Sequence, residues 1–498
     1  MTSATSDVGV PFGTKLHQTA MAMPDSTAII FVAQDGSERV VTFGEVDDRS
    51  TQLARVLVGK GLTVGDFVAI SLPNGPEHLI ASFAGWKVGA VVIPMRSDLP
   101  DWERARVLTA VGARMTIDTG HQDLFAVAKS ASTEPLPEVT APHAWGICSS
   151  GSTGMPKVIV MKDPGRYIEG SKVAMVVESY GELPQPQRVL VPAPLYHSNG
   201  FMATRNLMSG VEFVLLEKFD ASRVLDLIER HRITGFVGAT PMLQRLVQVP
   251  DVDQHDLSSL DWVQQGASPL PVWLGRRWCD LVGPEHFYVS YGASERHGLV
   301  CCRGDEWLEH IGTVGRCYPD TEMVILGDDG GPLPAGEIGA IYLRRTTGPG
   351  AAYRGADVSP LAATEDGYVT VGDMGSVDAD GYLYIADRRV DMIVSGGANV
   401  FPAEVEAALS EHLAVADVIV IGLRDEEWGR RIHAVIQAID PGHPPEAADV
   451  ITFAKSRLAA YKVPKSVEFV SVIPRNDAMK FNRAALTEER DGPEGPTP

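Results

Sequence analysis

The sequence predicts an α/β protein, with a large N-terminal part and a small α+β domain at its C-terminal end. Residues 12–145 alternate helical segments with short apolar runs, as in the succession Phe67–Leu72, Glu77–Lys87 and Ala90–Pro94. Such alternation is typical of a parallel sheet covered by helices. A further set of helix and strand patterns begins near residue 388. The chain of 498 residues is long enough for two or more domains.

Individual elements can be placed from local patterns. Thr42 is a candidate cap for a helix whose apolar face includes Val46 and Leu53. Pro402 lies in the first turn of another expected helix, where its missing N–H group does no harm. The remaining strands and helices are expected at Val189–Pro194, Gly235–Thr240, Gln264–Leu270, Gly336–Leu343, Tyr382–Asp387, Phe401–Ser410, Val415–Ile421, Ile432–Ile439 and Asp449–Leu458.

Composition limits the class of protein. The formal net charge of −21 argues against general binding to nucleic acid or to an anionic membrane. The five cysteines form no Cys-X-X-Cys pair, so we expect neither a zinc site nor a disulfide framework. Met1–Pro11 lacks the apolar core of a signal peptide, and no apolar run has membrane-spanning length. We therefore expect a cytoplasmic protein, whose oligomeric state is open and includes a homodimer.

The most informative stretch is Ile147–Lys157, which holds four hydroxyl side chains, two glycines and one lysine. Glycine lets backbone N–H groups approach an anion, hydroxyls donate hydrogen bonds, and Lys157 adds positive charge. This combination of groups suits a loop that binds a triphosphate. The alternative interpretation is a flexible Ser/Gly linker. The apolar run Val158–Met161 predicts that the loop joins two strands. The expected phosphate-binding residues are Ser149, Ser150, Gly151, Ser152, Thr153, Gly154 and Lys157.

Ser-Ser-Gly-Ser-Thr-Gly-Met-Pro-Lys resembles the phosphate-binding signature of the adenylate-forming superfamily, which includes acyl-CoA synthetases, luciferases and peptide-synthetase adenylation domains. Later motifs follow in the family's order, so the resemblance covers essentially the whole chain. It implies a large N-terminal domain, residues 1–387, of α/β subdomains with mixed sheets and a small β-barrel. A hinge at residues 388–391, with Val390 and Asp391, would lead to a small mobile α+β domain, residues 392–498. The tail after Glu489, rich in Pro, Gly and acidic residues, is expected to be disordered.

Two motifs imply the nucleotide and metal contacts. In Tyr-Gly-Ala-Ser-Glu, which ends at Glu295, the resemblance places the aromatic ring near adenine and the glutamate on Mg²⁺. Val371-Gly372-Asp373 resembles the family's Thr-Gly-Asp, whose aspartate accepts hydrogen bonds from both ribose hydroxyls, and Arg388 matches an arginine that also reaches the ribose. The implied ATP ligands are Ser294 for phosphate, and Gly266, Ala267, Ser268, Tyr291, Gly292, Asp373 and Arg388 for adenine and ribose.

The resemblance also implies a pocket for the carboxylic acid. Its mouth would lie at Leu195-Tyr196-His197-Ser198-Asn199-Gly200, where His197 gates the pocket or faces the adenylate, or merely caps a strand. Small residues in two neighbouring strands suggest space for an apolar acid larger than acetate, although they could equally permit tight packing. The implied pocket residues are Tyr196, His197, Phe201, Val237, Gly238, Gly266, Ala293, Gly298 and Leu299.

Two segments of the small domain are implied to serve different half-reactions. Lys480 matches a lysine that contacts the carboxylate while the acyl-adenylate forms. The family usually places Ser/Thr-Gly before this lysine, whereas this chain has Ala478-Met479, so its loop is expected to be stiffer. Ser395, Gly396 and Gly397 match a loop that approaches the acyl group when the thiol attacks. Lys480, His197 and Glu295 are therefore the expected catalytic residues, and Glu295 the metal ligand.

The motifs together indicate an ATP- and Mg²⁺-dependent ligase that activates a carboxylic acid as an acyl-adenylate. The leading interpretation is an acid–CoA ligase, nearest to ligases of bile acids and other bulky acids, with CoA as co-substrate. The alternative is an amide bond synthetase, in which an amine takes the acyl group. A non-catalytic binding protein of the same fold is a third interpretation, which the presence of Lys157, Glu295, Asp373, Arg388 and Lys480 disfavours.

Overall fold

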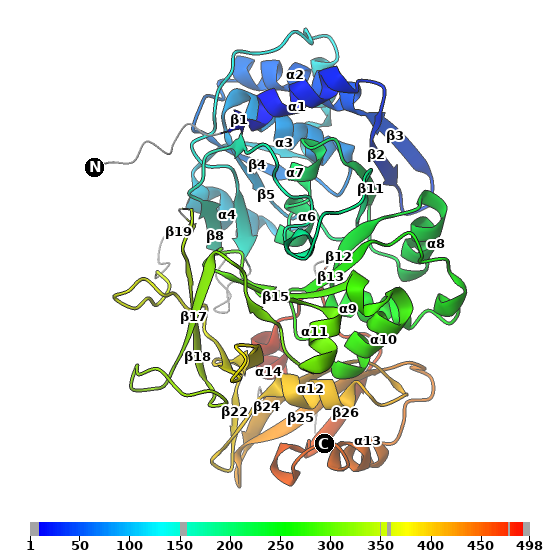
Figure 1. The fold of residues 1–498 in the computed structure, drawn as a ribbon, viewed down its shortest axis with the longest axis vertical. Coiled ribbons are helices and arrows are strands. Elements are labelled where there is room, and N and C mark those ends of the chain that lie inside the picture. Colours follow the sequence, from blue (N-terminus) through cyan, green and yellow to red (C-terminus); the bar gives the residue numbers. More distant parts are fainter. Residues whose placement is uncertain (1–8, 150–156, 349, 356–359, 477–478, 492–498) are drawn as a thin grey trace.

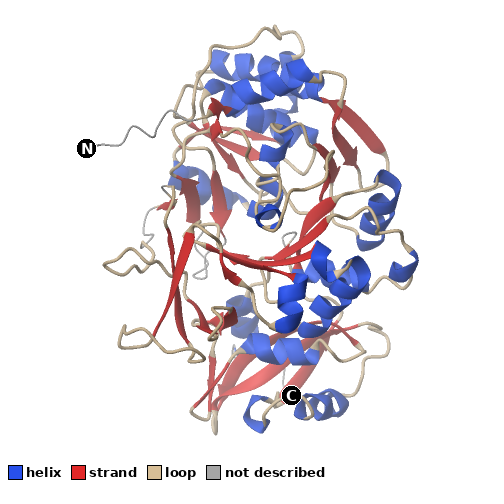
Figure 2. Ribbon diagram, viewed as in Figure 1, coloured by secondary structure: helices blue, strands red, loops and turns tan. Residues whose placement is uncertain are grey.

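The computed structural model describes residues 9–149, 157–348, 350–355, 360–476 and 479–491. Figure 1 shows a large body built from the first three quarters of the chain, with a small orange and red domain against one end. Helices pack on the outer faces of the strands (Figure 2). The α/β fold class with a large N-terminal and a small C-terminal part is confirmed.

The N-terminal part contains a parallel sheet in the order β5-β4-β6. Helix α3 joins β4 to β5 and is almost wholly buried. Helix α2 begins at Thr42, whose hydroxyl accepts a hydrogen bond from the N–H of Glu45, while the Glu45 carboxylate accepts one from the N–H of Thr42. This capping box confirms the predicted helix start. The elements are α1 (Phe12–Ala22), α2 (Phe43–Gly59), β4 (Phe67–Ser71), α3 (Pro76–Val88), β5 (Val91–Pro94), α4 (Asp101–Val111), β6 (Ala113–Asp118) and α5 (Gln122–Ala128).

A nine-stranded sheet in the order β16-β15-β14-β13-β12-β10-β11-β2-β3 forms the centre of the molecule. The six strands from β14 to β2 run parallel, and the other three pair antiparallel with their neighbours. The strands are β2 (Thr27–Val32), β3 (Glu38–Thr42), β10 (Arg188–Val191), β11 (Glu212–Leu216), β12 (Gly235–Ala239), β13 (Trp262–Gly266), β14 (Phe287–Gly292), β15 (Leu299–Arg303) and β16 (Arg316–Cys317).

The two faces of the strands β12 to β14 are used differently. Phe236, Val263 and Val289 point to one face, where they form a core with buried side chains such as Leu243 and Trp278 from the covering helices. Trp262 and Tyr288 point to the other face, into the core shared with the N-terminal helices. The helices of this region are α6 (Ser198–Phe201), α7 (Thr204–Leu207), α8 (Ala221–His231), α9 (Thr240–Val247), α10 (Val272–Val282) and α11 (Gly304–Glu309).

Two further sheets, of three and four strands, belong to the large part. Strands β7 (Gly146–Ser149) and β8 (Lys157–Met161) pair antiparallel, with Ser149 opposite Lys157, so the predicted loop between two strands is confirmed. Strand β19 (Ala351–Arg354) pairs with β8. The second sheet is antiparallel, in the order β17-β18-β20-β21. Its strands are β17 (Thr321–Leu326), β18 (Gly339–Arg345), β20 (Asp373–Val377) and β21 (Leu383–Arg388).

The predicted small barrel corresponds to this four-stranded sheet. Within the described residues its ladder pairs β17 with β18, β18 with β20 and β20 with β21, and does not pair the two outer strands. The inner side chains Ile325, Ile341 and Leu343 pack instead against Val300 of β15. The sheet therefore covers its apolar face with the central sheet rather than by closing on itself.

The small domain is built on an antiparallel pair of long strands, joined in parallel by a third. The predicted tail needs a correction, because α14 extends to Asp491, so that the two residues after Glu489 are helical. The Arg490 guanidinium pairs with the Glu468 carboxylate at 2.7 Å, which holds this helix end on the sheet. The elements are β22 (Ile393–Ser395), β23 (Ala398–Val400), α12 (Pro402–Leu409), β24 (Val415–Asp425), β25 (Gly429–Ala438), α13 (Ala447–Lys455), β26 (Ser466–Val470) and α14 (Arg483–Asp491).

Membrane-spanning helices were not expected. Across the part of the chain that the structure describes, every helix is too short or too polar to cross a bilayer.

Close packing of β12 on β13 gives a test of the fold. A Cβ atom on Gly235 would lie 2.1 Å from Cε2 of the buried Trp262, whereas a Cβ on Gly59 in α2 would have open space. We expect Gly235→Ala to destabilise the protein by about 1–3 kcal/mol, because the indole must shift in a packed core. The matched control Gly59→Ala should be neutral or slightly stabilising, since alanine favours helix. Thermal unfolding of both variants measures the difference, and equal midpoints would contradict the packing.

Candidate active site

The predicted site residues gather where β13 and β14 end. Gly266 is the last residue of β13, and Gly292 is the last residue of β14, with Ser294 and Glu295 in the turn that follows. The Ser294 hydroxyl hydrogen-bonds the Ser198 hydroxyl at 2.6 Å, which ties this turn to the start of α6. Carboxyl ends of parallel strands are a common place for ligand sites. The sheet thus brings together segments that are about 100 residues apart.

Glu295 and Lys157 both contact Tyr353. The Tyr353 hydroxyl donates a hydrogen bond of 2.6 Å to Oε1 of Glu295, and Lys157 Nζ lies 5.3 Å from the centre of the same ring. Burial first, and then the Glu295 carboxylate, raise the pKa of Tyr353, so it stays a donor. The sequence reasoning missed Tyr353, because a lone aromatic in a strand has no distinctive pattern. It joins the expected metal ligand to the end of the phosphate loop.

The residues Ser150, Gly151, Ser152, Thr153 and Gly154 of the predicted phosphate loop lie outside the described residues. Ser149 ends β7, and Lys157 begins β8, so the described strands bring the loop's two ends together. At the other predicted nucleotide loop, Ala267 has a φ of +71°, a left-handed conformation that is uncommon for alanine. The carbonyl of Ser268 accepts hydrogen bonds from the side chains of Gln265 and Thr240, which holds this turn in place.

Asp373 binds two of the residues that were predicted to act with it. Its Oδ2 accepts a hydrogen bond of 2.8 Å from the Tyr291 hydroxyl, and its Oδ1 accepts one of 3.2 Å from Nε of Arg388. Asp373 and Arg388 are also opposite each other in the β20–β21 ladder. Burial, followed by the charge of Asp373, raises the pKa of Tyr291. Three of the predicted adenine and ribose residues, Tyr291, Asp373 and Arg388, therefore form one hydrogen-bonded group.

The positive charge of Lys480 acts on His197. His197 caps α6, and burial first and then the positive charge of Lys480 lower its pKa to about 3, so the imidazole is neutral at physiological pH. Loss of surrounding water at the amine, followed by the charge of Arg388, lowers the pKa of Lys480, although Glu295 opposes this shift and the residue as a whole is exposed. His197 therefore cannot serve as a cationic acid near neutral pH.

The loop that carries Lys480 is anchored by its neighbour. Met479 has a φ of +60° and packs in an apolar cluster with Ala193, Ala239 and Met242 of the large part. Two further contacts cross between the parts, from Nε2 of Gln244 to the carbonyl of Ala416 (2.9 Å) and from Nε1 of Trp273 to the hydroxyl of Ser410 (3.0 Å). These contacts orient the small domain so that Lys480 reaches the site, while Ala478 lies outside the described residues.

The predicted thiol-facing loop and the predicted hinge lie apart from Lys480 in the chain. Gly396 and Gly397 have φ of +57° and +83°, and the N–H of Gly396 donates to the carbonyl of Trp428. A Cβ on Gly396 would lie 2.6 Å from the Trp428 ring, so glycine is required there. Ser395 is buried at the end of β22. In the predicted hinge, Val390 is exposed, and Asp391 Oδ1 lies 3.6 Å from Nε of Arg483.

Asp387, the last residue of the predicted large domain, contacts the small domain directly. Its carboxylate accepts a hydrogen bond of 2.9 Å from the N–H of Ala403, in the first turn of α12. Burial raises the pKa of Asp387 to about 6, although the bond to Ala403 and the charge of Arg483 act in the opposite direction. A carboxylate at a helix N-terminus satisfies an otherwise unpaired N–H group.

Three predicted acid-pocket residues need correction. Gly238 points to the helix-covered face, where a Cβ would lie 2.6 Å from Leu243, so it permits packing rather than leaving room for an acid. Phe201 is buried, and its ring packs near Trp86 and Trp145 in the core. A Cβ on Gly298 would lie 2.8 Å from side-chain atoms of Leu343 and Thr321, so this glycine also permits close packing rather than leaving room for an acid. Partly exposed predicted positions are Tyr196, His197, Val237, Ala293 and Leu299.

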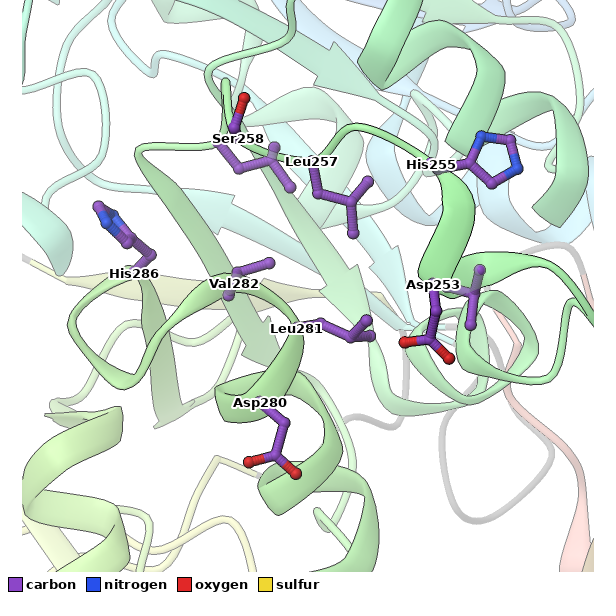
Figure 3. Close-up of a pocket in the computed structure, with 10 residues that line it drawn as sticks. Asp253, His255, Leu257, Ser258, Asp280, Leu281, Val282 and His286 are labelled. Carbon is purple, nitrogen blue, oxygen red and sulfur yellow. The ribbon is translucent and has the colours of Figure 1, made fainter.

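A separate groove of about 360 Å³ lies near the amino ends of strands β13 and β14 (Figure 3). Its lining includes Leu257 and Ser258, which come before β13, and His286, which comes just before β14. The predicted residues Gly266 and Tyr291 lie near the other ends of these strands. The groove is therefore not the candidate active site.

Comparison with known proteins identifies the family. Residues 16–352 match the model of the family described as AMP-binding enzyme, and residues 404–480 match that of the AMP-binding enzyme C-terminal domain. The chain therefore belongs to the AMP-binding enzymes, the adenylate-forming superfamily that its motifs resemble. This confirms the predicted family.

Individual relatives cover nearly the whole chain. Feruloyl-CoA synthase of an Amycolatopsis species is 32% identical over 462 residues, which cover 89% of this chain and 92% of that protein. The structure of o-succinylbenzoate-CoA synthetase from Bacillus subtilis with its acyl-adenylate intermediate is 27% identical, with a TM-score of 0.81, and the match covers 97% of this chain and 99% of that one. The same enzyme has been solved with ATP and a magnesium ion.

The fold is also shared with an amide bond synthetase, McbA from Marinactinospora thermotolerans. That structure has a TM-score of 0.75 and covers 96% of this chain and 99% of that one, at 24% sequence identity. A likeness at this level of identity concerns the fold alone.

The lowered pKa of Lys480 gives a test of its environment. Deprotonation removes the cation, so we expect kcat/KM for ATP to fall as the pH rises through a value below the usual lysine range of about 10.4. Lys480→Arg should move this fall to higher pH, because guanidinium stays protonated. Initial rates of pyrophosphate release between neutral pH and about pH 10 measure both profiles. A fall at the same pH in both enzymes would contradict the assignment to Lys480.

Proposed function

We propose that this protein is an ATP-dependent acid–CoA ligase, which forms an acyl-adenylate and pyrophosphate and then transfers the acyl group to the thiol of CoA. The observation that carries the proposal is the convergence of Lys157, Glu295 and Lys480 with the bonded group of Asp373, Arg388 and Tyr291. The CoA ligases among its relatives, which span nearly the whole chain, support the same activity.

In the first half-reaction the chain's own residues bind and orient ATP. Asp373 and Arg388 would bind the ribose, while the hydroxyl-rich loop and Lys157 would hold the phosphates that leave. Lys480 would lie at the acid carboxylate, where its positive charge stabilises negative charge that develops as the oxygen attacks the α-phosphate. Neutral His197 would line the mouth of the acid pocket rather than donate a proton.

The residues present fit a magnesium ion. Within the described residues, Glu295 forms no ion pair and accepts one hydrogen bond, from Tyr353. Mg²⁺ takes one or two carboxylates together with phosphates and water, so the single carboxylate of Glu295 suits it. Mg²⁺ at Glu295 would offset the charge of the phosphates.

We further propose that residues 1–387 and 392–498 act as two domains that change orientation about the hinge residues Val390 and Asp391. Lys480 would serve adenylation in the orientation seen here. After rotation, the loop Ser395–Gly397 would approach the adenylate and leave room for the thiol arm of CoA. The left-handed φ of Gly396 and Gly397 supports this role, because such a loop presents backbone without side chains.

The amide bond synthetase is not favoured as an alternative. The two CoA ligases described above are 32% and 27% identical to this chain, whereas the likeness to the amide synthetase, at 24% identity, concerns the fold alone. A cytoplasmic location fits the five cysteines, all of which are unpaired.

The first half-reaction gives the direct test of this function. We expect a suitable acid to promote exchange of labelled pyrophosphate into ATP, in the presence of Mg²⁺ and without CoA, and AMP to appear when CoA is added. Asp373→Asn should mainly raise KM for ATP, since a charge-assisted bond costs about 1.5–3 kcal/mol to lose. The isosteric change Asp380→Asn, in an exposed turn, is the control. Release of ADP and phosphate would contradict the proposal.

The division of labour in the small domain is tested separately. Lys480→Ala should slow adenylate formation by a factor of about 10²–10³, and should spare thioester formation from chemically prepared acyl-adenylate. Gly397→Leu should do the reverse, because the side chain would fill the approach of the thiol. Lys455→Ala, an exposed lysine of the same domain, should change neither step. Single-turnover assays of each half-reaction decide, and equal losses in both halves for Lys480→Ala would refute the scheme.

A further inference from the structure

One face of β12, β13 and β14 runs from the candidate active site toward the other end of these strands. Trp262 lies over Gly235 of the neighbouring strand, and Gln264 bonds Ser290, so these side chains share the face that looks away from the covering helices. We call this face the trough. Its positions, given by the two-residue period of a strand, are Gly235, Val237, Ala239, Trp262, Gln264, Gly266, Tyr288, Ser290 and Gly292.

The middle of the trough is open. Val237, Gln264 and Ser290 are each partly exposed, although strands flank β12–β14 on both sides and helices bury their other face. Val237 packs in part against the neighbouring core, so these central side chains keep their exposure because the packing over them is incomplete. Gln264 lies two residues before Gly266, so the partly exposed middle of the trough adjoins the end of β13 and the predicted ATP-binding residues there.

The floor of the trough is closed. Trp262 and Tyr288 are 2% and 5% exposed, and Nε1 of Trp262 donates a hydrogen bond of 3.0 Å to the buried Gln187. At a rise of about 3.3 Å per residue, Gln264 lies about 7 Å below Gly266, and Trp262 about 13 Å below it. That depth matches one ring between a carboxyl group and a substituent opposite to it, and is too short for a long alkyl chain.

The only side-chain amide among the nine trough positions is held in one orientation. The Ser290 hydroxyl donates its single proton to the carbonyl of Gln265 at 2.9 Å. It can therefore only accept from Gln264, whose Nε2 lies 3.0 Å away, and this fixes the amide against reversal. Within the described residues no donor is bonded to Oε1 of Gln264, so this oxygen is left as an acceptor in the trough.

We propose that the acid is ring-sized and carries a neutral hydrogen-bond donor, a hydroxyl or amino group, that binds Oε1 of Gln264; this rests on the proposed ligase function. None of the nine trough positions is charged, which disfavours a second carboxylate on the acid. The proposal keeps the expectation of an acid larger than acetate and corrects the expectation of a wholly apolar wall. A site with a fixed acceptor discriminates against analogues that lack the donor, because the acceptor is then buried unpaired.

The test compares acids that differ in one group, by pyrophosphate release with purified enzyme. 4-Hydroxybenzoate and 4-methylbenzoate have similar shapes, and dodecanoate probes length. We expect kcat/KM to favour the hydroxy acid over the methyl acid by about 10-fold or more, and dodecanoate to be the poorest. Gln264→Leu should bring the ratio of the two ring acids close to one, while Gln254→Leu, an exposed glutamine outside the trough, should keep the wild-type ratio.

A second variant guards against a folding defect. Gln264→Glu keeps an acceptor and adds negative charge, so it should gain activity on 4-(aminomethyl)benzoate, a cation, relative to the wild-type enzyme. Equal rates for the hydroxy and methyl acids in the wild type, or an unchanged ratio in Gln264→Leu, would overturn the inference while leaving the ligase function intact. Absence of pyrophosphate release with every acid would instead count against the proposed function itself.

Discussion

Burial of one face of β12, β13 and β14 is the constraint on which the rest of the structure depends. Phe236, Val263 and Val289 commit that face to a helix-covered core, so it is closed to ligands. The chemistry is left with the opposite face and the ends of the strands. Gly266 and Tyr291 lie there because their strands are parallel and in register, and Glu295 lies there because its turn follows β14.

Local positive charge is concentrated in this site against the field of a chain with a net charge of −21. Arg388 belongs to the predicted hinge and Lys480 to the small domain, and the positive charge of Arg388 contributes to lowering the pKa of Lys480. An anion bound near both groups would stabilise their charges. Asp373 and Glu295 offset part of this charge. Such an arrangement selects anionic ligands locally, whatever the charge of the surface.

Much of this could be predicted from the sequence, because short motifs fix residue type and spacing together. The family, the fold class and the strands on either side of the phosphate loop were all predicted correctly. Gly238 was misplaced because a small residue looks the same whether it leaves room or lets a neighbour pack. Strand periodicity would have helped, since Val237 and Gly238 must point to opposite faces. Tyr353 and Phe201 depend on tertiary packing, which no local pattern records.

The bond between Asp387 and the start of α12 has a consequence for how the two parts move. Its docked carboxyl group holds a proton more tightly than it would in water, since burial raises its pKa to about 6. Any reorientation that separates β21 from α12 would return this group to solvent and lower its pKa again, so that it would release the proton at a pH near or below 6. Protons therefore act as a ligand that favours the docked arrangement, and the equilibrium between domain orientations is coupled to the acidity of the surroundings.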